Sequence, residues 1–250
     1  MMMIQRRSRA LLVLIALAAF AALFTGCKAD SAVQRSSDID FNAEAQQARL
    51  RSASRPLTRD EAIDQNDGRP VLVCFGDSLT AGYGIDTTES YPAVLQRNLD
   101  AAGYRYRVVN LGISGDTTKD GLARIDRVMA LSPALVVLEF GGNDGLRGLP
   151  VSTTRENLDA MMARLVPTRT QIALAGITLP PEYGNAYVKD FDATYRMLSA
   201  KYHLPLLPFL LKDVYGVPGS LQQDGIHPTA KGAQQVAKNV MALIQPMLVK

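Results

Sequence analysis

The sequence contains few of the residues that form disulfides or bind transition metals. Among its 250 residues there are two cysteines, Cys27 and Cys74, and two histidines. Two cysteines cannot build a disulfide framework, and two histidines leave little for a histidine-based metal site. The fold therefore depends on a hydrophobic core, and a chain of this length that is 47% hydrophobic can bury a substantial one.

The chain also lacks a strong charge of either sign. Its formal net charge is +3, and Arg6, Arg7 and Arg9 all lie in an N-terminal segment that we expect to be removed. Without these arginines the remaining positive and negative charges balance. A nearly neutral protein provides no basic field for nucleic acid, so no nucleic-acid partner is expected.

Residues 1–27 have the three parts of a secretory signal. A basic segment, Arg6–Arg9, precedes an apolar run from Ala10 to Phe24, and small residues lead to Cys27. The apolar run, at about 15 residues, is shorter than the roughly 20 that span a bilayer comfortably. We therefore predict that residues 1–27 are a signal peptide and that the protein is exported to the periplasm.

The end of this segment, Leu23-Phe-Thr-Gly-Cys27, resembles the bacterial lipobox, in which a signal peptidase cuts before a cysteine that carries lipid. It departs from the usual pattern at Phe24, where leucine is commoner. The resemblance implies a lipoprotein that is anchored to a membrane through Cys27. A plain exported protein and a retained signal anchor are the two alternatives.

The segment from Lys28 to Arg69 differs in composition from the rest of the chain. It is rich in Ser, Gln, Asp, Arg and Ala, with almost no large apolar side chains and no sustained period. Such a segment cannot bury enough surface to offset the entropy that is lost on ordering. We predict a flexible linker over residues 28–69 and one folded domain over residues 70–250.

From Pro70 onward, apolar runs typical of buried strands alternate with helical patterns. This alternation predicts an α/β fold with three αβα layers, in which helices cover both faces of a five-stranded parallel sheet. The expected strands are Val71–Phe75, Arg107–Asn110, Ala134–Phe140, Gln171–Gly176 and Leu204–Pro208. The expected helices are Tyr91–Ala102, Thr118–Leu131, Thr154–Val166, Ala186–Tyr202 and Thr229–Leu248.

A serine stands just past the first expected strand. The apolar run Val71–Phe75 stops at the turn Gly76-Asp-Ser-Leu79. Ligands of open α/β sheets bind at the carboxyl ends of the strands, so Ser78 is a candidate nucleophile. Taken alone, Gly-Asp-Ser is also ordinary turn chemistry.

Other polar loops supply the groups that an activated serine needs at this edge of the sheet. His227 is a candidate base, and Asp224, three residues earlier across a glycine, can reach back to its imidazole. The backbone amide of Gly115, the side-chain amide of Asn143 and the Ser78 amide are suitable donors to an oxyanion. The sequence thus supplies a nucleophile, a base, a group that orients the base, and oxyanion donors.

Four blocks of this sequence resemble, in order, those of the SGNH (GDSL) hydrolases. They are Gly76-Asp-Ser-Leu79, Ile113-Ser-Gly-Asp-Thr117, Gly142-Asn-Asp144 and Asp224-Gly-Ile-His227. The likeness extends over nearly all of residues 70–250, and the run 141–148 looks like that of the periplasmic thioesterase, lysophospholipase and arylesterase branch. Residues 84–90 depart from the family pattern in a loop after the nucleophile.

The resemblance implies a flavodoxin-like SGNH fold that hydrolyses esters and thioesters without metal or organic cofactor. Carried over by position, it makes Ser78 the nucleophile, His227 the base and Asp224 its orienter. Gly115, Asn143 and the Ser78 amide would form the oxyanion hole. These are the roles that the chemistry of the residues suggests independently.

Several nearby residues have simpler structural interpretations. Asp77 is expected to cap its turn by accepting hydrogen bonds from backbone amides, and Asp144 to fix the loop that carries Asn143. Cys74 lies inside an apolar strand and is expected to be a small buried hydrophobe. His203 is expected to be a structural or surface residue.

Two apolar loops near the same edge contain Leu146, Leu149, Leu179 and Pro180. They could be ordinary loops or the walls of an acyl-chain pocket. The resemblance favours a pocket, because thioesterases of the family use the loop after the asparagine block in this way.

Together these features favour an exported serine esterase or thioesterase that acts on a small-molecule or lipid ester. A cell-wall carbohydrate O-deacetylase would use the same catalytic residues with a shallow polar pocket. A non-catalytic lipoprotein that binds lipid or a partner is a further alternative, but it would not need all five site residues. An α/β-hydrolase is disfavoured because Thr80 stands where the second glycine of its nucleophile elbow belongs.

Overall fold

The computed structural model of the chain describes residues 67–250. The predicted signal peptide, Cys27 and nearly all of the predicted linker lie outside the described residues. The predicted folded domain, residues 70–250, lies within them. No helix in this described range is both long enough and apolar enough to cross a membrane.

A five-stranded parallel sheet forms the middle layer of the domain. Its strands are β1 (Val71–Gly76), β2 (Arg107–Asn110), β3 (Leu135–Glu139), β4 (Gln171–Ala175) and β5 (Leu206–Leu207). They lie in the order β2-β1-β3-β4-β5, and each neighbouring pair is parallel. The central strands β1 and β3 are almost completely buried, which explains why both are continuous apolar runs in the sequence.

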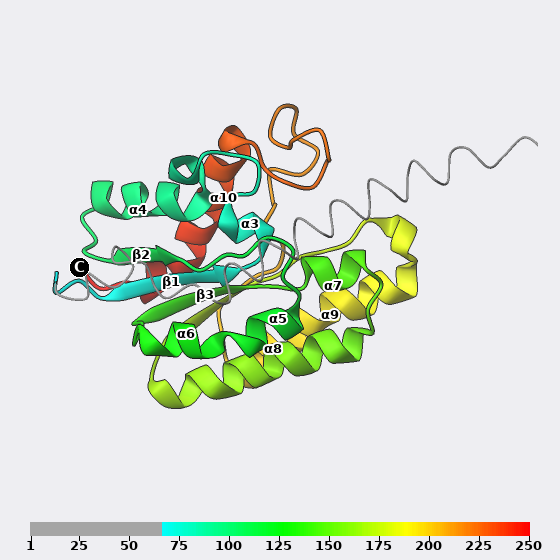
Figure 1. Cartoon of the computed structure of the whole chain (residues 1–250), viewed down its shortest axis with the longest axis horizontal. Coiled ribbons are helices and arrows are strands. Elements are labelled where there is room, and N and C mark those ends of the chain that lie inside the picture. The colour runs from blue at the N-terminus through cyan, green and yellow to red at the C-terminus, as the bar shows by residue number, and fades with distance from the viewer. Residues whose placement is uncertain (1–66) are drawn as a thin grey trace, which may run out of the picture. The chain divides into compact units, whose positions relative to one another are not determined.

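Helices cover both faces of this sheet (Figure 1). On one face, α4 (Tyr91–Ala101) packs against α10 (Ala230–Ile244). On the other face lie α5 (Thr118–Ala123), α6 (Ile125–Ala130), α8 (Val151–Leu165) and α9 (Asn185–Tyr202), and α8 contacts both α5 and α9. The three-layer αβα fold that the sequence predicts is confirmed.

Two short helices that the sequence did not predict follow the central strands. They are α3 (Ser78–Ala81) after β1 and α7 (Gly142–Leu146) after β3. Helices of four or five residues show no hydrophobic period, so the pattern gives no sign of them. They place Ser78 and Asn143 in first helical turns at the carboxyl edge of the sheet. Four 3-10 turns complete the described elements: η1 (Thr87–Glu89), η2 (Val166–Thr168), η3 (Pro181–Tyr183) and η4 (Gln245–Met247).

Several predicted boundaries are wrong. Helix α8 begins three residues before the predicted Thr154, and α10 ends four residues before the predicted Leu248. The predicted helix Thr118–Leu131 is two helices, because the backbone leaves helical geometry at Arg124 (φ −116°, ψ 14°). The guanidinium of Arg124 donates to the carbonyl of Leu111, just after β2, and to the carbonyl of Gly76, at the end of β1. Strand β5 is shorter than the predicted Leu204–Pro208, since Pro205 and Pro208 have no N–H to donate to a ladder.

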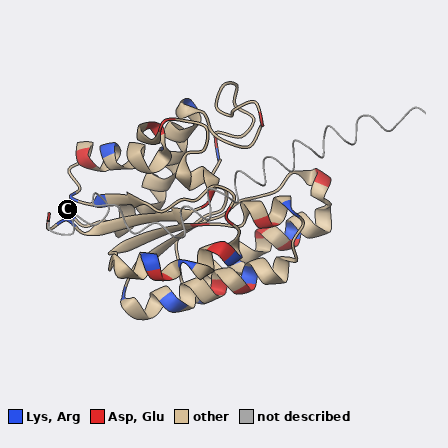
Figure 2. Cartoon of the chain, viewed as in Figure 1, with Lys and Arg blue, Asp and Glu red and all other residues tan. Residues whose placement is uncertain are grey.

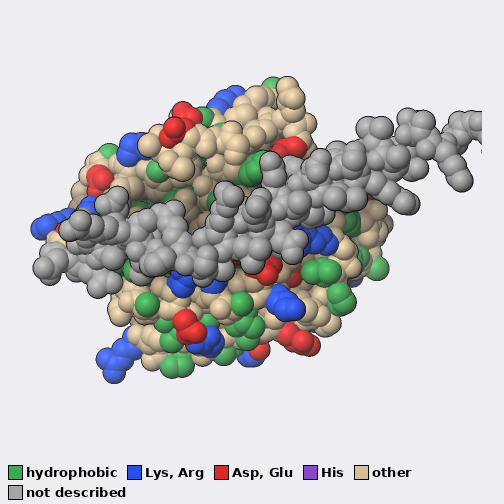
Figure 3. All heavy atoms as spheres, viewed as in Figure 1, with side chains coloured by type: hydrophobic (Ala, Val, Ile, Leu, Met, Phe, Trp, Pro, Cys, Tyr) green, Lys and Arg blue, Asp and Glu red, His purple; other side chains and the backbone are tan. Residues whose placement is uncertain are grey.

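Charged side chains of both signs are interspersed on the helices, while the strands carry few of them (Figure 2). The ion pairs Arg155–Asp190 and Lys201–Asp159 join α8 to α9. The face seen in Figure 3 also mixes acidic, basic and single hydrophobic side chains. The charge on the face seen in these figures is therefore mixed, in agreement with the balance of charges in the sequence.

Candidate active site

The structure brings Ser78, His227 and Asp224 into one chain of hydrogen bonds. The Ser78 Oγ lies 2.8 Å from Nε2 of His227, and Nδ1 of the same ring lies 2.7 Å from Oδ2 of Asp224. The second carboxylate oxygen of Asp224 accepts the backbone N–H groups of Ile226 (2.9 Å) and His227 (3.0 Å). The loop thus holds the carboxylate toward the imidazole, and the imidazole toward the serine.

Hydrogen bonds close the loop that carries His227 and join it to the segment after α3. Its ends are joined by a hydrogen bond from the backbone N–H of Gln222 to the backbone carbonyl of His227 (2.8 Å). The Gln222 side chain also donates to the carbonyl of Tyr83 at 2.7 Å. The ring of Tyr83 lies 4.6 Å from the His227 ring, so it restricts the orientations that the imidazole can adopt.

The hydrogen bonds around Asp224 favour its ionised form. Burial alone would raise the pKa of this carboxyl. Donation from the backbone amide and ring of His227, and from the backbone amide of Ile226, outweighs that effect, and the pKa of Asp224 lies below its ordinary value. A negative charge therefore remains beside the imidazole at neutral pH.

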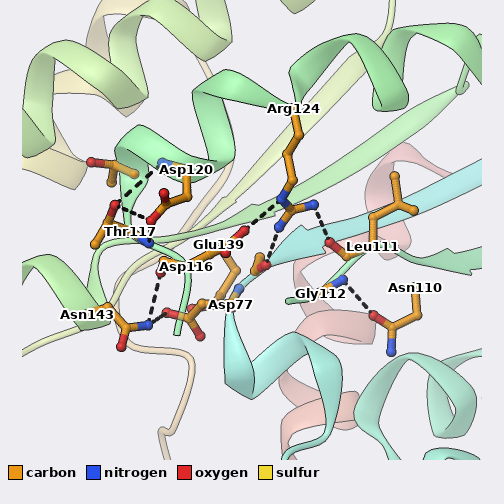
Figure 4. A network of polar contacts seen from close by, with 12 residues as sticks. Asp77, Asn110, Leu111, Gly112, Asp116, Thr117, Asp120, Arg124, Glu139 and Asn143 are labelled. Atoms are coloured by element: carbon orange, nitrogen blue, oxygen red, sulfur yellow. Dashed lines mark hydrogen bonds and ion pairs between the residues drawn. The ribbon is translucent and has the colours of Figure 1, made fainter. Parts of the chain in front are cut away.

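The two predicted oxyanion donors follow neighbouring strands: Gly115 lies in the loop after β2, and Asn143 lies in the first turn of α7, after β3. Gly115 adopts a left-handed conformation (φ +81°), and its carbonyl accepts a hydrogen bond from Arg147 at 3.0 Å. Asn143 donates through Nδ2 to the Asp77 carboxylate (3.2 Å) and to the Asp116 carbonyl (3.0 Å), as Figure 4 shows. Both hydrogens of this amide have acceptors in the structure.

Asp77 and Asp144 have the structural contacts that the sequence predicts. Asp77 accepts the backbone N–H of Leu79 at 3.0 Å and so caps α3. Asp144 accepts the backbone N–H (2.9 Å) and the hydroxyl (2.5 Å) of Thr118. Asp144 therefore ties α7, which carries Asn143, to the start of α5.

Sequence reasoning missed a further buried acid, Glu139, which contacts the turn that carries Ser78. Glu139 ends β3, is fully buried, and accepts hydrogen bonds from the Asp77 amide (3.3 Å) and the Thr80 hydroxyl (2.8 Å). Burial raises the pKa of Asp77 to about 7 and the pKa of Glu139 well above its ordinary value. A lone acid within an apolar strand is the sequence signal that could have indicated this support for α3.

An apolar cavity of about 450 Å³ opens beside the Asp224 loop. Leu146, Leu179 and Pro180, three of the four residues predicted for an acyl pocket, line it. Its lining also includes Ile177, Phe209, Tyr215 and Ile226. Leu149 does not line this cavity: it follows a tight turn and its carbonyl accepts from the hydroxyl of Tyr187 (2.7 Å), so this part of the pocket prediction is not supported.

Cys74 and His203 lie outside the triad, as expected. Cys74 is fully buried in β1, and burial raises the pKa of its thiol to about 12. His203 is exposed and ends α9 in a left-handed conformation (φ +54°). Within residues 67–250, no group of three or more histidine, cysteine, aspartate or glutamate side chains is arranged to hold a metal ion.

Comparison with known proteins agrees with this geometry. Residues 74–235 match the GDSL-like Lipase/Acylhydrolase family. Esterase TesA of Pseudomonas aeruginosa is 41% identical over 187 residues, which are 74% of this chain and 93% of that protein. The thioesterase 1/protease 1/lysophospholipase L1 of Escherichia coli K12 is 36% identical over 179 residues, 71% of this chain and 85% of that protein.

A solved structure shares the fold as well as the sequence. It is the psychrotrophic esterase EstA from Pseudoalteromonas sp., inhibited by monoethylphosphonate, with a TM-score of 0.68 and 31% identity. The match covers 71% of this chain and 97% of that one. With this fold, these four blocks and these relatives, the chain belongs to the GDSL-like lipase/acylhydrolase family, the SGNH hydrolases, and is a serine ester hydrolase.

Proposed function

We propose that the protein hydrolyses carboxylic esters and thioesters through an acyl-enzyme on Ser78. The observation that carries this proposal is the unbroken chain from Ser78 Oγ to His227 (2.8 Å) and from His227 to Asp224 (2.7 Å). A hydroxyl becomes an effective nucleophile when a base accepts its proton as it attacks. The relatives named esterase and thioesterase 1/lysophospholipase L1 support this class of substrate.

The proposed reaction has two halves. Ser78 Oγ attacks the ester carbonyl while His227 takes its proton, and the tetrahedral intermediate then expels the alcohol or thiol, which His227 protonates. Water then attacks the acyl-enzyme, gives its proton to His227, and releases the acid while Ser78 regains its proton. Asp224 remains ionised, orients the ring and stabilises the imidazolium that forms in each half.

The oxyanion would be held by the amides of Ser78 and Gly115 and by the side chain of Asn143. Each well-placed donor of this kind contributes about 3 kcal/mol to the barrier reduction. Asn143 already donates to Asp77 and Asp116, so donation to an oxyanion replaces one of these contacts. The longer bond, 3.2 Å to Asp77, is the one we expect to be exchanged.

The acyl chain would enter the cavity beside Asp224. Leu146, Leu179 and Pro180 give it apolar walls that suit a hydrocarbon chain better than a sugar. The test is the rate of p-nitrophenyl ester hydrolysis as a function of acyl chain length, with Ser78→Ala as the inactive control. We expect rates to rise beyond acetate, whereas activity confined to acetate would identify an O-deacetylase instead.

We further propose that the protein is exported and anchored through a lipid on Cys27. The signal-like segment and the lipobox resemblance at residues 23–27 support this proposal. The mass of the mature N-terminus tests it, with Cys27→Ala as the comparison. A mature wild-type chain with an unmodified Cys27 would contradict the anchor, and a chain that retains residues 1–26 would contradict cleavage.

A further inference from the structure

Arg124 connects three segments of the domain from a buried position. Its side chain is 13% exposed. Its Nε donates to the carboxylate of Asp116 (2.7 Å), Nη1 to the carbonyl of Leu111 (2.7 Å), and Nη2 to the carbonyl of Gly76 (2.9 Å). Figure 4 shows the guanidinium among these acceptors. One planar group thus contacts two backbone carbonyls and one side-chain carboxylate from three segments.

Each of these pieces leads into a proposed oxyanion donor. Gly76 ends β1 two residues before Ser78, and Leu111 follows β2 on the way to Gly115. Asp116 is the residue after Gly115, and its carbonyl accepts the Asn143 side chain at 3.0 Å. The guanidinium therefore contacts the segments that carry two donors directly, and it reaches the third donor, Asn143, through Asp116.

Two aromatic rings and one carboxylate complete the surroundings of the guanidinium. Its central carbon lies 4.5 Å from the centre of the Phe75 ring and 5.5 Å from that of Phe140. Phe75 precedes Gly76 in β1, and Phe140 follows β3 just before α7. Rings in this position attract a cation, and the buried carboxylate of Asp116 balances its charge. Arg124 is thereby held against the strands that support the donors.

We propose that Arg124 is a positioning residue that, through Asp116, aligns Asn143, the side-chain donor of the oxyanion hole, a role that rests on the proposed function of Ser78, Gly115 and Asn143. Asp116, fixed by Arg124, keeps one hydrogen of the Asn143 amide. The other hydrogen turns from Asp77 to the developing oxyanion. Without the guanidinium, Asp116 is no longer fixed and the amide loses the contact that keeps it aimed at the reaction centre.

Arg124→Lys tests this role because it keeps the charge and removes the planar fork. A single ammonium cannot reach three acceptors that the guanidinium contacts through three nitrogens. We expect kcat on a p-nitrophenyl ester to fall by about tenfold or more, with KM within about twofold, because the loss concerns the transition state. Arg155→Lys is the matched control, since Arg155 pairs with Asp190 on the helices away from the site; it should leave both constants unchanged.

A double-mutant cycle shows whether Arg124 acts through Asn143. In the Asn143→Ala background, Arg124→Lys should lower kcat by less than about threefold, because the donor that it aligns is already gone. An equal loss in both backgrounds would overturn the proposal, as would a rise in KM with kcat unchanged. If Asn143→Ala itself left kcat unchanged, the proposed oxyanion hole would fail instead, so the two failures are distinguishable.

Correct folding has to be measured alongside the rates. The thermal unfolding of each variant is measured in solution. The kcat of each variant is then corrected for inactive chains by dividing it by the fraction of chains that a fluorophosphonate labels at completion. If Arg124→Lys does not fold, Asp116→Asn tests the same proposal, since it weakens the contact between Arg124 and residue 116 and leaves the arginine in place. It should lower kcat in the same direction by a smaller factor; a folded Asp116→Asn variant with wild-type kcat would overturn the proposal.

Discussion

At the scale of single residues, the site joins side chains that are far apart in sequence. Ser78 and His227 are separated by 149 positions, yet their reacting atoms are 2.8 Å apart. Asn143 lies near them with its amide shared between Asp77 and Asp116. These contacts show which substitutions should affect turnover and which should affect stability.

Asn143→Ala should lower kcat and leave KM nearly unchanged. Loss of one oxyanion donor typically costs about 100-fold to 1,000-fold in kcat, because the bond strengthens only as charge develops on the oxygen. Steady-state kinetics on a soluble ester measure this change. The control is Asn98→Ala on α4, which should behave as wild type. A variant with wild-type kcat, or one that changes KM alone, would show that Asn143 does not hold the oxyanion.

Asp77→Asn should change how stability depends on pH. The pKa of Asp77 is raised to about 7, above its ordinary value of 3.8, so the stability given by its neutral form is fully present below pH 3.8 and is lost as pH rises through 7. On the order of 4 kcal/mol of unfolding free energy is linked to this group across that window. Asparagine still caps α3 but does not titrate, so the variant should lose less stability between pH 4 and 7.

Urea unfolding at a series of pH values measures this difference. Asp86→Asn is the matched control, because hydrogen bonds from the side chain and backbone of exposed Thr88 lower the pKa of Asp86. The Asp86→Asn variant should lose as much unfolding free energy as wild type when the pH rises above 5. Parallel curves for wild type and Asp77→Asn would mean that Asp77 is ionised throughout this range.

At the scale of elements, the start of α10 supports the loop that carries the base. Gly232 lies in the first turn of this helix, and a Cβ at this position would stand 2.1 Å from the carbonyl oxygen of Ser220. That carbonyl also accepts the backbone N–H of Thr229 at 3.0 Å. The segment between Ser220 and Thr229 contains Asp224 and His227 and therefore depends on this close approach.

Gly232→Ala should destabilise the protein although alanine is the better helix former. The helix gains about 1 kcal/mol in propensity, but the overlap with Ser220 forces a backbone shift that typically costs about 1–3 kcal/mol or more. We expect a lower midpoint of urea unfolding and a reduced kcat, since the loop that contains Asp224 and His227 moves with Ser220. Lys238→Ala, on the exposed side of the same helix, should change stability by less than about 0.5 kcal/mol. A stabilised Gly232→Ala variant would contradict this account.

Elements whose residues repeat a pattern could be predicted, and elements set by single contacts could not. Strand β2 has the predicted bounds, and β1 differs by one residue, because apolar runs between turn residues mark buried strands. The helix α3 is defined by one cap from Asp77, and the break between α5 and α6 by the contacts of Arg124. Such contacts depend on residues that only the folded chain brings together.

At the scale of the whole molecule, the parallel topology explains why the sequence could indicate which loops lie together at one edge of the sheet. Strands that run in the same direction bring the loops after β1, β2 and β3 to one edge, so Ser78, Gly115 and Asn143 meet there. Glu139 and Arg124 could not be assigned, because the partners that make them acceptable in the interior are distant in sequence. The prediction that Leu149 lines the acyl pocket was wrong, because the direction in which a loop turns decides which of its side chains reach a cavity.

The described domain contains every part of the proposed mechanism. The triad, the oxyanion donors and the apolar cavity all lie within residues 67–250. A chain that begins at residue 67 should therefore fold cooperatively, and its kcat/KM on a soluble ester should be within about threefold of the full-length value. Circular dichroism and steady-state kinetics compare the two chains. A shortened chain that folds but is inactive would show that residues 1–66 contribute to the site.

Covalent labelling of the full-length protein by a fluorophosphonate tests the central claim most directly. The Ser78 oxygen should displace fluoride, its proton passing to His227, and leave one phosphonyl group per chain on the peptide that contains Ser78, as mass spectrometry detects. Ser78→Ala should remain unlabelled, and His227→Ala should label much more slowly. An unlabelled wild-type protein, or an adduct that persists in Ser78→Ala, would contradict the assignment of Ser78 as the nucleophile.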